Sequence, residues 1–175
     1  GDSIVCQVGT ISDYKKFLTP FVNRAIEDGR NIVYFKFANK KPLFDDPSDD
    51  TIDSINNESI STDLTKIKIF QLDPNIGFNY FTLKISEIIK SEVKNTFYIF
   101  DNLTCLQRMW HSDSMIINFF SVICSYLHDL NAVSCFAIMR KAHSYVLPSK
   151  AREIAKVIFD IYTIDGKYYI HPLKV

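Results

Sequence analysis

Short apolar runs of six to eight residues recur along the chain, and apolar residues at three- to four-residue spacing lie between them. Such runs are typical of strands buried on both faces, and the spacing between them is typical of amphipathic helices. The runs are residues 3–8, 31–37, 67–72, 96–101 and 132–139. Strands that alternate with helices predict a largely parallel sheet with helices on both faces. We therefore expect an α/β domain of three layers.

The first helical stretch contains a proline, which complicates its prediction. Its apolar stripe is formed by Phe17, Leu18, Phe21, Val22, Ala25 and Ile26. Because the ring of Pro20 would clash with a preceding helical turn, we expect a short turn at 12–18 and a main helix from about residue 19. Thr19 would be the N-cap of this helix, and Gly29 would close its C-terminus.

Three further helices and one hairpin complete the predicted order of elements. The helices are expected at about 78–93, 114–130 and 149–156, with a loop at 102–113 before the second of them. Asp165-Gly166 separates two apolar, aromatic runs near the end of the chain, which predicts a two-residue hairpin turn. This hairpin would add an antiparallel edge to the sheet.

Residues 38–66 depart from the pattern, since they contain seven acidic residues, three lysines and few apolar positions. We expect an exposed polar insertion there, with a functional acidic lid as the alternative.

Charge and composition limit the classes of function. A chain of 175 residues with 20 basic and 20 acidic side chains has no basic block that would attract nucleic acid or an anionic membrane. The apolar runs are all far shorter than the ~18 residues of a membrane span, and no signal peptide is visible. Cysteines stand at positions 6, 105, 124 and 135 without metal-site or redox spacing. They predict buried, reduced thiols and a cytoplasmic protein.

The stretch that follows the first strand has nearly the spacing of a phosphate-binding loop, G-x-x-x-x-G-K-[S/T]. On that frame Gly9 is the first glycine, Tyr14 replaces the second, Lys15 is the lysine and Lys16 replaces the hydroxyl residue. A tyrosine obstructs the close approach of phosphate, Lys16 has no hydroxyl for Mg²⁺, and Asp13 adds a negative charge. We expect Tyr14 to fill or cover the phosphate space and the domain not to hydrolyse ATP.

Asp101 ends the run "FYIFD", which is the pattern that presents a carboxylate to Mg²⁺ in P-loop enzymes. If the chain binds a metal ion, Asp101 is the residue that we expect to hold it. The alternative is that Asp101 caps or anchors a loop.

The chain resembles the RecA-like ATPase fold of the KaiC type, and more closely the N-terminal domain of proteins related to phosphoenolpyruvate synthase and pyruvate, phosphate dikinase. The matching segments are "DYKKFLTPF", "NIVYFKFA", "QLDPNIGF", "FYIFDNL", "WHSDSMIINFF", "RKAHS" and "YYIHPLKV". The resemblance implies the strand order 3-2-4-5-1-6-7. It also implies that residues 1–175 are a single RecA-like domain cut from a longer protein.

The same resemblance implies a function. We expect a non-hydrolysing accessory domain that acts by docking or ligand sensing, without a cofactor of its own. Its partner would be the phosphoenolpyruvate synthase-like region of the same polypeptide, and self-association into a homo-oligomer is a second option. The alternative is a nucleotide-dependent phosphotransferase or ATPase that uses ATP and Mg²⁺ at an atypical site around Lys15, Asp101 and His143.

Ligands of such sheets lie at the carboxyl ends of the strands. The candidate ligand-binding residues at that edge are Gly9, Lys15, Asp101, Asn102, Trp110, His111, Arg140 and His143. Arg108 and Asp113 belong to the loop that could close over them. The alternative is structural: Asp101 caps a loop, His143 forms local hydrogen bonds and Trp110 packs on the sheet. The phosphohistidine chemistry of the dikinases is not carried over to His143, which lies in a different sequence context.

Overall fold

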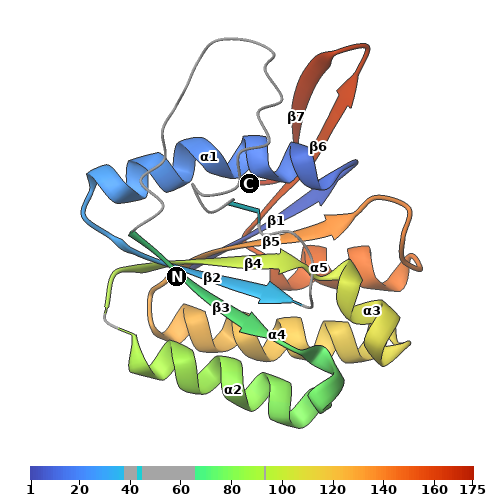
Figure 1. Cartoon of the computed structure of the whole chain (residues 1–175). Helices are drawn as coiled ribbons and strands as arrows, with labels where there is room; N and C mark the ends of the chain where they lie inside the picture. The colour runs from blue at the N-terminus through green and yellow to red at the C-terminus, as the bar shows by residue number, and fades with distance from the viewer. Residues whose placement is uncertain (38–42, 45–65, 93) are drawn as a thin grey trace, which may run out of the picture.

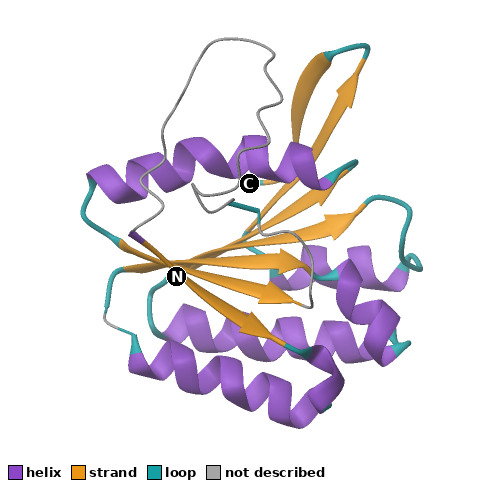
Figure 2. Cartoon of the chain, in the orientation of Figure 1, coloured by secondary structure: helices purple, strands orange, loops and turns teal. Residues whose placement is uncertain are grey.

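One seven-stranded sheet is the centre of this chain, as the computed structural model shows (Figures 1 and 2). The structure describes residues 1–37, 43–44, 66–92 and 94–175. The strands are β1 Asp2–Val8, β2 Asn31–Phe37, β3 Ile67–Leu72, β4 Thr96–Asn102, β5 Val133–Met139, β6 Val157–Ile164 and β7 Lys167–Lys174. They lie in the order β3-β2-β4-β5-β1-β6-β7, and only the β6–β7 pair is antiparallel. The predicted strand order and C-terminal hairpin are confirmed.

Helices cover both faces of the sheet, so the predicted three-layer α/β architecture is also confirmed. They are α1 Ile11–Glu27, η2 Pro74–Ile76, α2 Phe78–Ser91, α3 Thr104–Trp110, α4 Asp113–Asp129 and α5 Val146–Ile154. Figure 1 shows α1 on one face and α2, α4 and α5 on the other, with the short α3 beside the carboxyl ends of the strands.

The prediction for the first helix is wrong, because α1 is one continuous helix that begins at Ile11 and includes Pro20. Its N-cap is Thr10, and the hydroxyl of Thr19, the predicted cap, donates to the Lys15 carbonyl at 2.8 Å. An internal proline costs about 3 kcal/mol. The helix nevertheless buries Tyr14, Phe17 and Leu18 before the proline and Val22 and Ala25 after it. Since each fully buried large apolar side chain contributes about 1.5–3 kcal/mol, packing of this face outweighs the proline.

Two other boundaries differ from the prediction. The predicted loop at 102–113 contains α3, whose inner side buries Cys105 and Leu106. Helix α5 begins at Val146 rather than near 149, because Pro148 lies in its first turn, where a backbone N–H has no helical partner to lose. At the hairpin, Asp165 and Gly166 have φ values of 49° and 74°, as the predicted two-residue turn requires.

Two apolar cores lie on opposite faces of the sheet. The core under α1 includes Tyr14, Phe17, Leu18, Tyr34 and Ile99. The core under α2, α4 and α5 includes rings from neighbouring strands, and Phe100 stacks on Phe136 with ring centroids 4.3 Å apart. All four cysteines are buried thiols outside any disulfide, as predicted, and burial raises the pKa of the Cys124 thiol to about 12.

The predicted insertion at 38–66 lies largely outside the described residues. Leu43 and Phe44, which belong to it, are buried rather than exposed. The Leu43 N–H donates to the Tyr34 hydroxyl at 3.4 Å, and the Phe44 ring meets the Tyr34 ring edge-on. This part of the segment therefore packs on the core.

Within the described residues, the structure contains no helix that is both long and apolar enough to cross a membrane.

Candidate functional site

The connection between β1 and α1 is only Gly9-Thr10, because α1 begins at Ile11. It is closed by a capping box. The N–H and hydroxyl of Thr10 donate to Oδ2 of Asp13 at 3.0 and 2.9 Å, and the Asp13 N–H donates to the Thr10 hydroxyl at 3.1 Å. The Thr10 hydroxyl thus satisfies an amide in the first turn of the helix, and the Asp13 carboxylate satisfies the N-cap amide.

Asp13 is also tied to the C-terminal hairpin. Its other carboxylate oxygen accepts a hydrogen bond from the Thr163 hydroxyl at 2.7 Å, and its carbonyl accepts one from the Tyr168 hydroxyl at 3.1 Å. Asp13 is only 4% exposed. A Cβ atom added to Gly9 would lie 3.3 Å from Oδ2 of Asp13, so the carboxylate lies directly against the glycine. The turn therefore holds a buried carboxylate directly beside Gly9.

Tyr14 does not cover this turn, which corrects the expectation for it. The side chain is fully buried in the core beneath α1, and its hydroxyl donates to the Phe100 carbonyl of β4 at 3.1 Å. Burial raises the pKa of Tyr14 well above its ordinary value. Lys15 follows within the helix and is partly exposed. Asp13, and not Tyr14, therefore occupies the space at the turn.

Asp101 and Asn102 anchor backbone at the end of β4. Asp101 is 7% exposed, and its carboxylate accepts hydrogen bonds from the N–H groups of Phe37 at 3.2 Å and Asn102 at 2.8 Å. The Asn102 side-chain oxygen accepts from the Thr104 N–H at 2.9 Å. In these contacts Asp101 acts as the loop anchor that the structural alternative describes, and Asn102 anchors the start of α3 in the same way.

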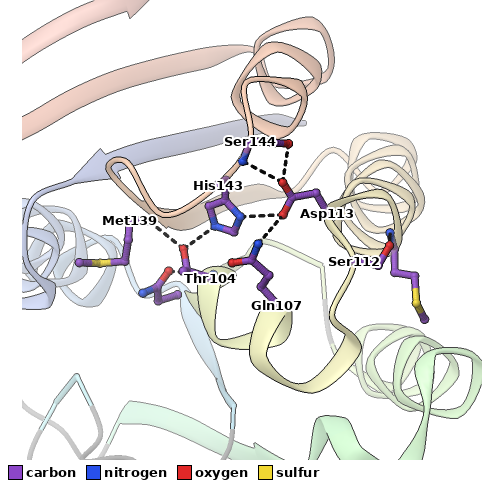
Figure 3. Close-up of polar contacts among 9 residues, drawn as sticks. Thr104, Gln107, Ser112, Asp113, Met139, His143 and Ser144 are labelled. Atoms are coloured by element: carbon purple, nitrogen blue, oxygen red, sulfur yellow. Dashed lines mark hydrogen bonds and ion pairs between the residues drawn. The ribbon is translucent and has the colours of Figure 1, made fainter.

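A chain of three polar side chains joins α3, α4 and the loop after β5 (Figure 3). Nε2 of His143 lies 2.7 Å from the Thr104 hydroxyl, and Nδ1 lies 2.9 Å from Oδ1 of Asp113. The Thr104 hydroxyl also accepts the Met139 N–H at 2.9 Å. The His143 side chain is 1% exposed and that of Asp113 is 14% exposed. A carboxylate, an imidazole and a hydroxyl are thus aligned at the carboxyl edge of the sheet.

Further hydrogen bonds fix the Asp113 carboxylate in place. Oδ2 accepts from the Ser144 N–H at 3.0 Å and from its hydroxyl at 2.6 Å, and Oδ1 accepts from Nε2 of Gln107 at 3.1 Å. Partial burial opposes ionisation, but the hydrogen bonds from Ser144 and His143 outweigh it, so the pKa of the Asp113 carboxyl is lowered. Asp113 is therefore ionised at neutral pH.

The other candidates lie elsewhere. Nε1 of Trp110 donates to the Pro74 carbonyl at 3.2 Å, and its ring packs against Phe78, Phe81 and Phe119. His111 ends α3 in the left-handed region and is exposed.

Arg140 turns toward the hairpin strand β6. Its guanidinium lies 2.8 Å from Asp160 and 4.5 Å from the centre of the Tyr162 ring. Among the eight predicted residues, Asp101 accepts a hydrogen bond from the neighbouring Asn102 N–H, and Asn102 and His143 are linked through Thr104.

Neither a protein-family model nor a curated protein matches this chain. Across the described ranges, no three His, Cys, Asp or Glu side chains gather as a metal site would require.

Sequence reasoning missed Thr104 and Ser144 and placed Asp113 only in a covering loop. Thr104 comes two residues after the end of β4, at the edge where the candidates were sought. Ser144 directly follows His143 in the sequence. Their positions in the sequence could have indicated both residues as members of the site. The α3 helix that orients Thr104 was not predicted.

A cavity of about 590 Å³ lies at the opposite edge of the sheet, between the ends of α2 and α4. Its lining mixes charges, with Lys90, Lys94, Glu92 and Asp129. Glu92 is paired with Lys68 at 2.8 Å. This mixture favours no single class of ligand.

Proposed function

We propose that this chain is a non-hydrolysing, RecA-like accessory domain that acts by docking or ligand sensing. In this proposal it serves a protein related to phosphoenolpyruvate synthase and pyruvate, phosphate dikinase. The shared strand order and the segments that resemble that family support the proposal.

One observation supports the absence of ATP hydrolysis above all others. The buried Asp13 carboxylate accepts hydrogen bonds from the N–H and hydroxyl of Thr10 and from the Thr163 hydroxyl. A phosphate group placed against this turn would meet a negative charge at short range, without a loop of free amides to compensate. Like charges about 4 Å apart cost on the order of 1–4 kcal/mol near a protein surface.

The alternative, a phosphotransferase that uses ATP and Mg²⁺, has weaker support. The Asp101 carboxylate accepts two backbone N–H groups, and the Thr104 and Asp113 side chains bracket the His143 imidazole. In these contacts the Asp101 carboxylate and the His143 imidazole both bond to groups of the protein itself.

The test measures ATP turnover and ligand binding by the whole chain. We expect no release of phosphate above background with Mg²⁺-ATP. Steady turnover that Asp101→Ala abolishes would favour the phosphotransferase. A thermal-shift series with nucleotides, pyruvate and phosphoenolpyruvate then separates the two accessory roles, since saturable stabilisation by one small molecule supports sensing.

Docking is tested with the proposed partner region. The chain is mixed with a separately purified phosphoenolpyruvate synthase-like region, and the mass of the complex is measured by sedimentation. A stable heteromeric complex supports docking in cis, and a concentration-dependent dimer of the chain alone supports the homo-oligomer. If the chain forms neither complex and no small molecule stabilises it, the accessory role is overturned.

A further inference from the structure

The Thr104–His143–Asp113 chain has no use in the accessory role, yet it has the order of groups that activates a hydroxyl. We propose that Thr104 accepts acyl groups from carboxylic esters, with His143 as its general base and Asp113 as a positioning residue. This proposal goes beyond the accessory function and does not depend on nucleotide binding.

The Asp113 carboxylate determines which imidazole nitrogen is free. It accepts hydrogen bonds from Nδ1 of His143, from Nε2 of Gln107 and from both the N–H and the hydroxyl of Ser144. Because an ionised carboxylate has no proton to donate, Nδ1 must carry the proton on this side. In the neutral ring, Nε2 is then an acceptor that faces the Thr104 hydroxyl.

Two hydrogen bonds orient the Thr104 hydroxyl so that its proton faces His143. Its proton is donated to Nε2 of His143, 2.7 Å away, and one lone pair accepts the Met139 N–H at 2.9 Å. A hydroxyl oxygen has a second lone pair, which is available for attack on a carbonyl carbon. The His143 side chain is 1% exposed whereas Thr104 is partly exposed, so an ester would meet this chain at Thr104.

The reaction conserves atoms and charge. The Thr104 oxygen forms a bond to the ester carbonyl carbon while its proton moves to Nε2 of His143. The bond from that carbon to the alkoxy oxygen then breaks, and the alcohol leaves with the proton from His143. Thr104 keeps the acyl group as an ester. Water then attacks this ester while His143 takes a proton from the water. The carboxylic acid leaves as the proton returns from His143 to the Thr104 oxygen.

The experiment treats the whole chain with p-nitrophenyl acetate. Release of p-nitrophenol is followed by absorbance, and the acetylated peptide is located by mass spectrometry after digestion. We expect one acetyl group on Thr104, none in Thr104→Val, and retained acetylation in Thr104→Ser. His143→Gln should slow acetylation by about 10²–10⁴-fold, which is the usual contribution of a general base. The matched control is His171→Gln, an exposed histidine on β7, which should react like the unaltered chain.

The positioning role of Asp113 is tested with a signal that a purely structural role would leave unchanged. The Nδ1 proton of His143 should give a low-field proton resonance that Thr104→Val keeps and Asp113→Asn loses, in parallel with slower acetylation. The location of the acetyl group in the unaltered chain decides the proposal even if a variant fails to fold. Acetylation only at lysines, or at the same rate in His143→Gln, would overturn it.

Discussion

The Asp13 carboxylate accepts a hydrogen bond from the Thr163 hydroxyl at 2.7 Å and so joins the first turn of α1 to strand β6, 150 positions later. Asp13 also completes the capping box with Thr10. Asp13, which does not fit the pattern of a phosphate-binding loop, is therefore part of a structural junction between α1 and β6. This junction has consequences for stability that can be measured.

Asp13→Ala should lower the free energy of unfolding by about 1–3.5 kcal/mol. The change removes an N-cap partner, usually about 0.5–2 kcal/mol, and also the hydrogen bond from the hydroxyl of the exposed Thr163, about 0.5–1.5 kcal/mol. Urea unfolding followed by circular dichroism measures the effect. Asp28→Ala is the matched control, since Asp28 is the exposed partner of an ion pair with Arg24 and should change stability by less than about 1 kcal/mol. Equal effects of the two changes would contradict the role of Asp13.

Pro20→Ala should stabilise the chain by about 2–2.6 kcal/mol. A proline inside a helix costs about 3 kcal/mol, and its replacement returns roughly 0.4–1 kcal/mol of entropy to the unfolded chain. Pro20 is exposed in the middle of α1, so alanine leaves no cavity. The midpoint of thermal unfolding is the measurement.

Pro148→Ala is the control for this prediction, because Pro148 lies in the first turn of α5 and replaces no helical hydrogen bond. It should not stabilise the chain. If both changes stabilise it equally, the position of Pro20 within the helix is not the cause.

The contrast between these prolines shows how far the sequence could predict the fold. Continuous apolar runs identified β2 and β3 with their observed boundaries, because strands buried on both faces leave a strong local pattern. The continuous α1 helix could not be derived from local propensity, since burial of Tyr14 beneath it overrides the proline.

The candidate site shows the same division between local and long-range causes. His143 was predicted because the carboxyl ends of parallel strands meet at one edge. Its partners Thr104 and Asp113 come from positions 39 and 30 residues away, and their alignment depends on how α3 and α4 pack. Long-range packing of this kind has no local pattern in a single sequence.

Tyr14→Phe should destabilise the chain by about 1–3 kcal/mol without creating affinity for nucleotides. The change removes only the hydroxyl that donates to the buried Phe100 carbonyl at 3.1 Å, which is left unsatisfied. Chemical unfolding measures the stability, and calorimetric titration with Mg²⁺-ATP measures the binding. Tyr80→Phe, at a ring that is 51% exposed, is the control and should be neutral. Nucleotide binding in Tyr14→Phe would show that the tyrosine, rather than Asp13, blocks the turn.

Tyr98 should contribute to unfolding at high pH. Burial raises the pKa of Tyr98 from 10.0 to about 12, so the folded chain keeps a proton that the unfolded chain loses. The stabilisation is complete below about pH 10 and is lost as the pH rises to about 12, with a total near 3 kcal/mol for a shift of about two pKa units. Tyr98→Phe should therefore flatten the decrease of the unfolding free energy between about pH 10 and about pH 12, measured by urea unfolding at each pH. Tyr14 and Tyr34, whose pKa values are also raised by burial, should maintain part of the decrease. The exposed Tyr80→Phe variant should follow the unaltered chain, and an unchanged slope in Tyr98→Phe would show that Tyr98 ionises without unfolding the domain.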